Sequence, residues 1–181
     1  PEGSSPAIEL FGRPIFDFGQ IISGPVGIYK SVGGTWTKVN SDLVAGSHVT
    51  LSADGKVLAI GSKAGYVRIY QNESGTWTQI GNDIPRPEGA VGVYPVDSIS
   101  LSNDGSVIAI GSYGNDGHGS NRGNVRIYKN VAGTWTQVLN DIDGEANFDY
   151  SGDSISLSSD GSVIAIGARG NDGNGEDSGH V

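Results

Sequence analysis

The chain has 181 residues, a formal net charge of −9 at pH 7, 30 glycines and no cysteine. The acidic balance argues against nucleic acid as a partner, and the lack of cysteine excludes disulfides and thiolate metal sites. No apolar run is long enough to cross a bilayer, so membrane insertion is not expected. Many glycines fall between short, strongly patterned apolar runs, which is typical of a protein with many turns.

The first 25 residues lie outside the pattern that fills the rest of the chain. They hold three of the four phenylalanines, namely Phe11, Phe16 and Phe18, and a phenylalanine ring is a large apolar anchor. One interpretation is an extra strand or two packed on the chain's own core. The other is an N-terminal extension that docks on a neighbouring copy as an inter-subunit tether.

From residue 26 onward, one unit is repeated. It joins a Ser-x-Asp-Gly turn, an apolar strand of the VIAIGS type, a strand ending in Ile-Tyr and a Gly-Thr-Trp-Thr segment. Two units are whole, at 47–80 and 97–138. Residues 26–39 repeat only the second half of the unit, and residues 153–181 repeat only the first half. We therefore expect one repeat domain over residues 26–181.

Each whole unit is predicted to fold as a four-stranded antiparallel meander. In residues 97–138, apolar and polar residues alternate around Ile99 and Leu101, and a continuous β-branched run follows at 107–110. This pattern predicts strands, and the Asp104-Gly105 pair between them favours a tight hairpin. The expected fold class is all-β, with about three β-propeller-like blades. A β-trefoil, which also has three four-stranded units, is the alternative.

The closing half unit carries a family resemblance. An aromatic residue and a glycine, Tyr150 and Gly152, precede one strand, Ala168 ends the next, and Gly179 to Val181 opens a third. This order resembles the FG-GAP repeat of integrin α-subunit β-propellers. The tandem LSxDGxxIAIG and GTWTQ patterns are similar to those of extracellular repeat proteins of bacteria and algae. The resemblance implies propeller-type blades. The integrin-type calcium loop, with several aspartates, is missing, so calcium is not implied at that position.

A different place for calcium is the long loop of the closing half unit. Asp172, Asn174, Glu176 and Asp177 present oxygen atoms with glycine between them, as a hard cation requires. The alternative is a solvated hairpin loop in which Asn, Asp and Gly serve the turn geometry. No other cofactor is expected. Asn72 opens an N-glycosylation sequon, so the protein is a candidate glycoprotein.

The sequence shows no catalytic constellation. Its three histidines, His48, His118 and His180, occupy different positions in the repeat, and no serine lies in a G-x-S-x-G nucleophile elbow. The tryptophan of each Gly-Thr-Trp-Thr segment is either a packing anchor between blades or a platform for a sugar ring. We therefore expect a protein that is not an enzyme. Catalytic residues elsewhere in a longer chain are the remaining alternative.

The two half units complement each other. Residues 153–181 supply the first two strands of a blade, and residues 26–39 supply the last two. Because an unpaired strand edge invites another strand, the chain either closes on itself or receives the missing strands from the next copy. A head-to-tail contact that does not close produces a filament.

The composition and the two complementary half units together favour one function. An acidic, cysteine-free β protein rich in Gly, Ser and Thr suits an extracellular or cell-surface location. We expect a structural protein that self-assembles with copies of itself into a fibre or surface layer. The alternative is an adhesion module of the propeller type that binds glycans or cell-surface proteins.

Overall fold

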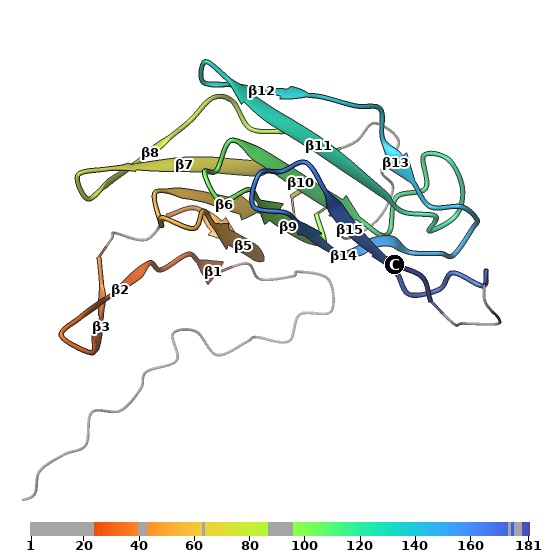
Figure 1. Ribbon diagram of the computed structural model, residues 1–181, viewed down its shortest axis with the longest axis horizontal. Coiled ribbons are helices and arrows are strands. Elements are labelled where there is room, and N and C mark those ends of the chain that lie inside the picture. The colour runs from red at the N-terminus through yellow and green to blue at the C-terminus, as the bar shows by residue number, and fades with distance from the viewer. Residues whose placement is uncertain (1–23, 40–42, 63, 87–95, 174, 176–178) are drawn as a thin grey trace, which may run out of the picture.

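The computed structural model describes residues 24–39, 43–62, 64–86, 96–173, 175 and 179–181. These residues form strands and turns without a helix (Figure 1). Consequently, the described part of the chain has no helix of the length and apolarity needed to cross a membrane. The predicted all-β fold class is confirmed.

The unit at 47–80 is a four-stranded antiparallel sheet. Its strands are β5 (His48–Leu51), β6 (Val57–Gly61), β7 (Val67–Glu73) and β8 (Thr76–Gln79). They are hydrogen-bonded in the order in which the chain meets them, so this unit is the predicted meander.

The unit at 97–138 repeats that sheet. Its strands are β9 (Ser98–Leu101), β10 (Val107–Ser112), β11 (Asn124–Val131) and β12 (Thr134–Gln137). They also pair in chain order, and a short strand of the following connector, β13 (Ile142–Asp143), pairs with β11.

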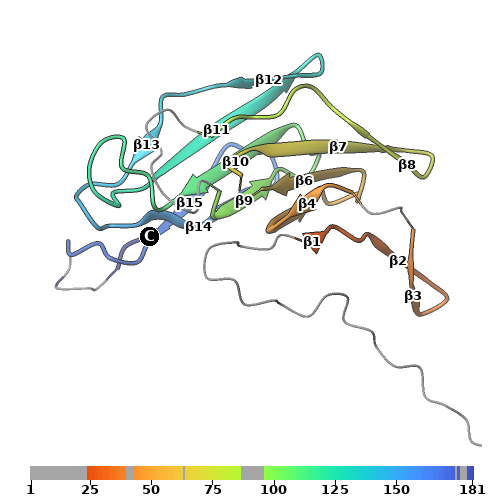
Figure 2. The same ribbon diagram turned by 180° about the vertical axis from the view of Figure 1, so that it is seen from behind.

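Each half unit forms a two-stranded sheet. The closing half contains β14 (Ser151–Leu157) and β15 (Ile164–Ala168), and the opening half contains the hairpin of β2 (Tyr29–Val32) and β3 (Thr35–Lys38). Two further strands, β1 (Gly24–Pro25) and β4 (Ala45–Gly46), pair with each other. The hairpin β2–β3 and the pair β14–β15 lie apart in both ribbon views (Figures 1 and 2).

The Ser-x-Asp-Gly turns have the predicted geometry. Ser52 donates its hydroxyl to the Asp54 carboxylate at 2.8 Å and accepts the Val57 N–H at 2.9 Å. The glycines that follow the aspartates, Gly55 and Gly105, have φ of 69°, which is the left-handed region that glycine enters without steric cost. The third turn, at Ser158 to Gly161, has the same bonds and a φ of 70°.

Successive sheets pack face to face through apolar layers. Between the two whole units, Val67 and Ile69 share one cluster with Ile108 and Ile110. Between the second unit and the closing half, Ala109, Val125 and Ile127 contact a set of apolar side chains that includes Ile164 and Ile166. This stacking of equivalent faces favours propeller-like blades over the β-trefoil.

The same layer continues towards the start of the chain. Leu58, Ile60 and Tyr70 of the first whole unit form a cluster, and Val26 and Ile28 pack against it. These two residues occupy the repeat positions of Val125 and Ile127. The hairpin β2–β3 therefore stands where the outer two strands of a preceding blade would stand.

Candidate assembly surfaces

The edge of β15 is the first candidate surface. In the whole units the equivalent strand pairs on both sides, β6 with β5 and β7 and β10 with β9 and β11. Among the described residues, β15 pairs along its length with β14 alone. Only its end is covered, because Ala168 and His180 exchange backbone hydrogen bonds of 2.8 and 2.9 Å. Within the described residues, the stretch from Ile164 to Gly167 is therefore an open strand edge.

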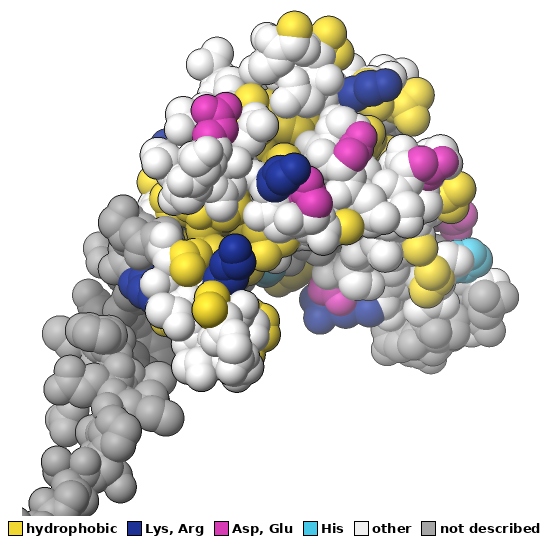
Figure 3. Space-filling view, turned by 60° about the vertical axis from the view of Figure 1, so that its left-hand side comes forward, with side chains coloured by type: hydrophobic (Ala, Val, Ile, Leu, Met, Phe, Trp, Pro, Cys, Tyr) yellow, Lys and Arg dark blue, Asp and Glu magenta, His cyan; other side chains and the backbone are white. Residues whose placement is uncertain are grey.

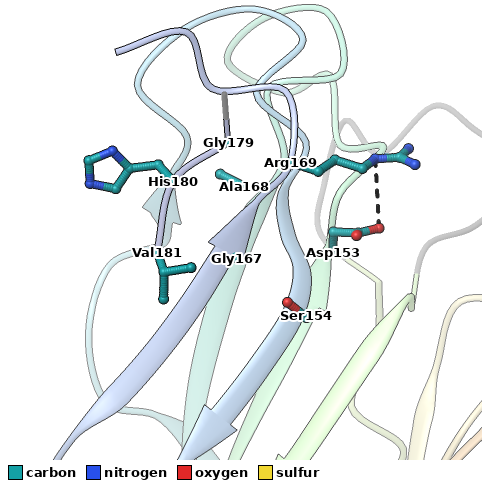
Figure 4. Close-up of a pocket in the computed structure, with 8 residues that line it drawn as sticks. All are labelled: Asp153, Ser154, Gly167, Ala168, Arg169, Gly179, His180 and Val181. Atoms are coloured by element: carbon teal, nitrogen blue, oxygen red, sulfur yellow. Dashed lines mark ion pairs between the residues drawn. The ribbon is translucent and has the colours of Figure 1, made fainter. Parts of the chain in front are cut away.

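A cleft of about 450 Å³ lies at the covered end of this edge. Figure 4 shows Gly167 and Ala168 in its middle, with Asp153 and Arg169 to one side and His180 and Val181 to the other. Val181 occupies the repeat position at which Val67 and Val125 lie in the third strand of the whole units. The cleft therefore marks the start of the third strand of this blade.

Arg169, which lines that cleft, contacts two aromatic rings and a carboxylate. Its guanidinium carbon lies 5.0 Å from the ring centre of Tyr113 and 4.5 Å from that of Tyr150. Its Nε lies 3.9 Å from the Asp153 carboxylate (Figure 4). Because this ion pair is exposed, it contributes little stability, and the aromatic contacts are the stronger constraint. Arg169 thus connects the closing half to the second whole unit.

Asp97 lies beside the same contact, between the second unit and the closing half. Burial raises the pKa of the Asp97 carboxyl to about 7. Backbone N–H groups of Tyr113 and Gly114 donate to the carboxylate and act in the opposite direction. Since β9 contacts β14, the charge on Asp97 is expected to affect how the closing half is held.

The second candidate surface is the hairpin β2–β3. Every residue of its two strands is exposed. Tyr29 is 56% exposed, whereas Tyr128, at the same repeat position, is 8% exposed. Trp36 is 70% exposed, so the interpretation of the tryptophans as packing anchors is wrong for Trp36 in the single chain. Trp135 is half-buried against the core and donates its Nε1–H to Ile80 O at 3.2 Å.

The proposed calcium loop is only partly described. Asn174, Glu176 and Asp177 lie outside the described residues, and the main-chain oxygen of Asp172 accepts the Gly175 N–H at 2.9 Å. The described residues contain no group of three or more His, Cys, Asp or Glu that could hold a metal ion. The calcium hypothesis is untested.

The other predicted site residues have mixed outcomes. Phe11, Phe16 and Phe18 also lie outside the described residues. Asn72 is in β7, and its side-chain oxygen accepts the Gly75 N–H at 2.8 Å. The equivalent Asn130 does the same with Gly133, so Asn72 has a structural role in its hairpin, and its glycosylation stays a prediction.

Two buried asparagines of the long loops were not predicted as site residues. Asn115 and Asn171 are 6% and 4% exposed. Each accepts the N–H of the glycine two residues later, at 2.7 and 2.9 Å. Asn171 also donates to Glu145 and Asp149 at 3.1 and 3.2 Å. The signal was the Asn-Asp-Gly tripeptide that both long loops share.

The space-filling view shows how the surfaces are arranged. In Figure 3 the molecule is arched over an open gap, with a lobe on either side. Lys, Arg, Asp and Glu side chains are scattered over this face, some of them as adjacent pairs of opposite charge, rather than gathered in one patch. On this face no basic stripe of the kind that tracks a nucleic-acid backbone is visible.

No protein-family model matches the sequence, and no curated protein is significantly similar to it. Several solved structures do match. A putative 6-phosphogluconolactonase from Bacteroides fragilis is 19% identical with a TM-score of 0.49, over 72% of this chain and 33% of that chain. Hydrazine synthase from Kuenenia stuttgartiensis is 16% identical with a TM-score of 0.45, over 78% and 33%. Sqt1 from Saccharomyces cerevisiae is 14% identical with a TM-score of 0.43, over 62% and 28%.

The chain spans about a third of the length of these structures. The first of them is named as an enzyme, which contradicts the expectation that this chain is not one. The expectation was wrong because architecture does not decide catalysis, and one fold carries many functions. At 19% identity the likeness concerns the fold alone, so it assigns no reaction to this chain. It tests neither the FG-GAP resemblance nor the extracellular location.

Proposed function

We propose that this protein is an extracellular structural module that assembles head to tail with copies of itself into a fibre or surface layer. In this assembly, the hairpin β2–β3 of one copy completes the blade that β14 and β15 begin in the next copy. The observation that carries the proposal is the match between this exposed hairpin and the outer hairpin of a complete blade.

The match extends to backbone conformation. In β2–β3, Tyr29 pairs with Lys38 and Val32 with Thr35, and in β11–β12 the equivalent pairs are Tyr128 with Gln137 and Val131 with Thr134. The two turn residues have φ of 59° and 83° in the first hairpin and 51° and 84° in the second. Positive φ at both central residues is the geometry of a type I′ turn. The hairpin is thus already shaped as the outer half of a blade.

The strand register between β15 of one copy and β2 of the other copy follows from the register within the complete blade. There, Val107 pairs with Lys129 and Ile108 pairs with Tyr128. Transferred to the contact between copies, Lys30 of one copy pairs with Val163 of the next copy, and Tyr29 pairs with Ile164. These pairs lie beyond the part of the edge that the chain's own His180 covers. The contact would bury Tyr29 to the degree seen for Tyr128, and removal of apolar surface from water is the main driving force for association.

The Phe-rich residues 1–25 are the proposed tether, because they directly precede the hairpin in the chain. A shortened chain that begins at residue 26 tests this role. It is expected to keep its folded far-ultraviolet circular dichroism spectrum and to lose assembly. If the shortened chain assembles as the full chain does, the tether is refuted while blade completion stands.

The solution mass of the full chain tests the proposal itself. Sedimentation velocity over a concentration series is expected to show a mass that keeps growing with concentration, and negative-stain microscopy is expected to show filaments. A head-to-tail contact that does not close has no preferred final size. A chain that stays monomeric up to millimolar concentration, or stops at a closed dimer, contradicts the proposal.

One observation favours the alternative of a glycan-binding adhesion module. Tyr29 and Trp36 are 56% and 70% exposed on the same hairpin, and exposed aromatic faces can stack on sugar rings. A glycan array separates the two functions. Specific binding that is lost in Trp36→Ala, by a chain that does not assemble, would favour adhesion.

A further inference from the structure

The turns of successive blades are linked by a backbone contact that occurs twice. The N–H of Ala53 donates to the carbonyl oxygen of Asn103 at 2.9 Å. The N–H of Asn103 donates in turn to the carbonyl oxygen of Ser159 at 2.9 Å. These residues hold the same position in the three Ser-x-Asp-Gly turns. The first and second turns therefore each give one hydrogen bond to the next blade.

A side-chain contact accompanies each of these bonds. A Cβ atom added to Gly105 would lie 2.5 Å from Cβ of Val57 in the preceding blade. A Cβ added to Gly161 would lie 2.9 Å from Cβ of Val107. Real Cβ atoms do not approach so closely, because packed interiors leave no room for overlap. The glycine is thus required by the valine of the preceding blade as well as by its own φ.

In the first and last of the three turns, the same groups have no such partner among the described residues. Val163, equivalent to Val57 and Val107, is 65% exposed. No atom lies within 4 Å of a Cβ added to Gly55. Among the described residues, the N–H of Ser159 has no acceptor of this kind and the carbonyl of Ala53 has no donor.

The inner strand of the first whole unit is uncovered in the same way. Val49 and Leu51 in β5 are 56% and 49% exposed. Leu101, which occupies the position of Leu51 in the next unit, is 8% exposed because it packs in the cluster between blades. Within the described part of the chain, the inner strand β5 of the first unit thus has no neighbour on the side that receives the preceding blade.

The geometry points to a contact between copies through these two faces. We define the leading face by Ala53, Gly55, Val49 and Leu51, and the trailing face by Ser159 and Val163. The trailing face of one copy packs on the leading face of a second copy, with Val163 against Gly55 and the Ser159 N–H donating to the Ala53 carbonyl. The partner is a second copy because the two faces are the two halves of a contact that the chain already makes twice within itself.

This inference rests on the proposed blade completion and adds the surface that selects the partner. Val26 and Ile28, which directly precede the hairpin β2–β3, pack on the first whole unit. When the β15 edge of another copy pairs with that hairpin, β14 and β15 are brought against the same unit, next to β5 and β6. A side chain at position 55 would then obstruct the contact between the two copies, because Val163 of the other copy packs directly on Gly55.

Substitution of Gly55 tests the leading face. Gly55→Asn keeps a residue that tolerates positive φ, and the open space around it leaves the single chain folded. Its association constant is expected to fall at least tenfold in sedimentation velocity. The matched control is Gly75→Asn, because Gly75 has a φ of 96° and also lacks neighbours within 4 Å, but it lies in the turn between β7 and β8 and belongs to neither of the two defined faces. The control is expected to associate as the unmodified chain does.

Substitution of Val163 tests the trailing face separately. Val163→Asp is expected to weaken association at least tenfold, whereas Val131→Asp, at a position that is 56% exposed, is expected to change it less than twofold. A disulfide between Lys30→Cys of one copy and Val163→Cys of another reports blade completion by itself. If the disulfide forms but Gly55→Asn and Val163→Asp associate normally, the face contact is refuted and blade completion survives. If the unmodified chain stays monomeric, both are refuted.

Discussion

The contact between turns of neighbouring blades can be measured within the single chain. Gly55 and Gly105 are matched positions, since both have φ of 69° in the same type of turn. They differ in their surroundings, because a Cβ at Gly55 meets no atom within 4 Å and one at Gly105 meets Val57 at 2.5 Å. A comparison of the two substitutions therefore separates backbone strain from steric overlap.

We expect Gly55→Asn to lower the free energy of unfolding by about 1 kcal/mol or less, because asparagine tolerates the left-handed region. Gly105→Asn carries the same backbone cost and overpacks the contact with Val57, which adds roughly 1 to 3 kcal/mol. Two of the three atoms closest to the added Cβ are the methyl carbons of Val57. Val57→Ala should therefore relieve part of the overlap, with a coupling of about 1 kcal/mol in a double-mutant cycle.

The assay is urea unfolding followed by tryptophan fluorescence, at a concentration low enough to keep the chain monomeric. Linear extrapolation gives the free energies, and an unchanged slope shows that the unfolded state is the same. Equal destabilisation by Gly55→Asn and Gly105→Asn would refute the reasoning, because the neighbouring blade would then impose no constraint on the turn.

Three further predictions concern single side chains. Burial raises the pKa of the Asp97 carboxyl to about 7. The stability that the protonated carboxyl contributes is therefore complete below about pH 4 and is lost as the pH rises through 7. In unfolding measured from pH 4 to 8, Asp97→Asn should remove this loss, which is roughly 1 to 2 kcal/mol after allowance for solvent screening. Arg68 and Asp83 form two hydrogen bonds of 2.7 Å, so Asp83→Asn should cost about 1 to 2 kcal/mol in urea unfolding. Trp135→Ala should cost about 3 kcal/mol, and Trp36→Ala less than about 0.5 kcal/mol in the monomer; similar losses for both would show that exposure does not set the cost.

The strands and turns could be predicted from the sequence because their causes are local. The alternation around Ile99 and Leu101 fixes which face is apolar, and the Asp-Gly pairs fix where the chain reverses. The repeat then required every unit to have the same form. These features depend on residues a few positions apart, so a single sequence displays them.

Contacts between units could not be predicted, because the same residue type has different neighbours in each. Arg68 pairs with Asp83, and Asp141 stands at the same spacing from Arg126. Yet Asp141 accepts from Asn124 at 2.7 Å. Arg126 is instead buried and donates to the Pro85 carbonyl at 3.0 Å. Burial between blades decides this difference, and no local pattern encodes it.

The central claim is that the open β15 edge receives the hairpin of another copy. In the complete blade, Asn130 N–H donates to Ser106 O. The adjacent cross-strand pair, Val107 and Lys129, is therefore a non-hydrogen-bonded pair of the antiparallel ladder. In such pairs the Cα atoms are about 4.5 Å apart, which a disulfide can bridge.

The direct measurement is therefore a mixing experiment with this otherwise cysteine-free chain. One preparation carries Lys30→Cys and the other carries Val163→Cys, and the two are mixed under mild oxidation. Blade completion predicts a mixed disulfide dimer in large excess over either homodimer. Random pairing of the two cysteines, or no cross-link at concentrations where the chain assembles, would contradict it.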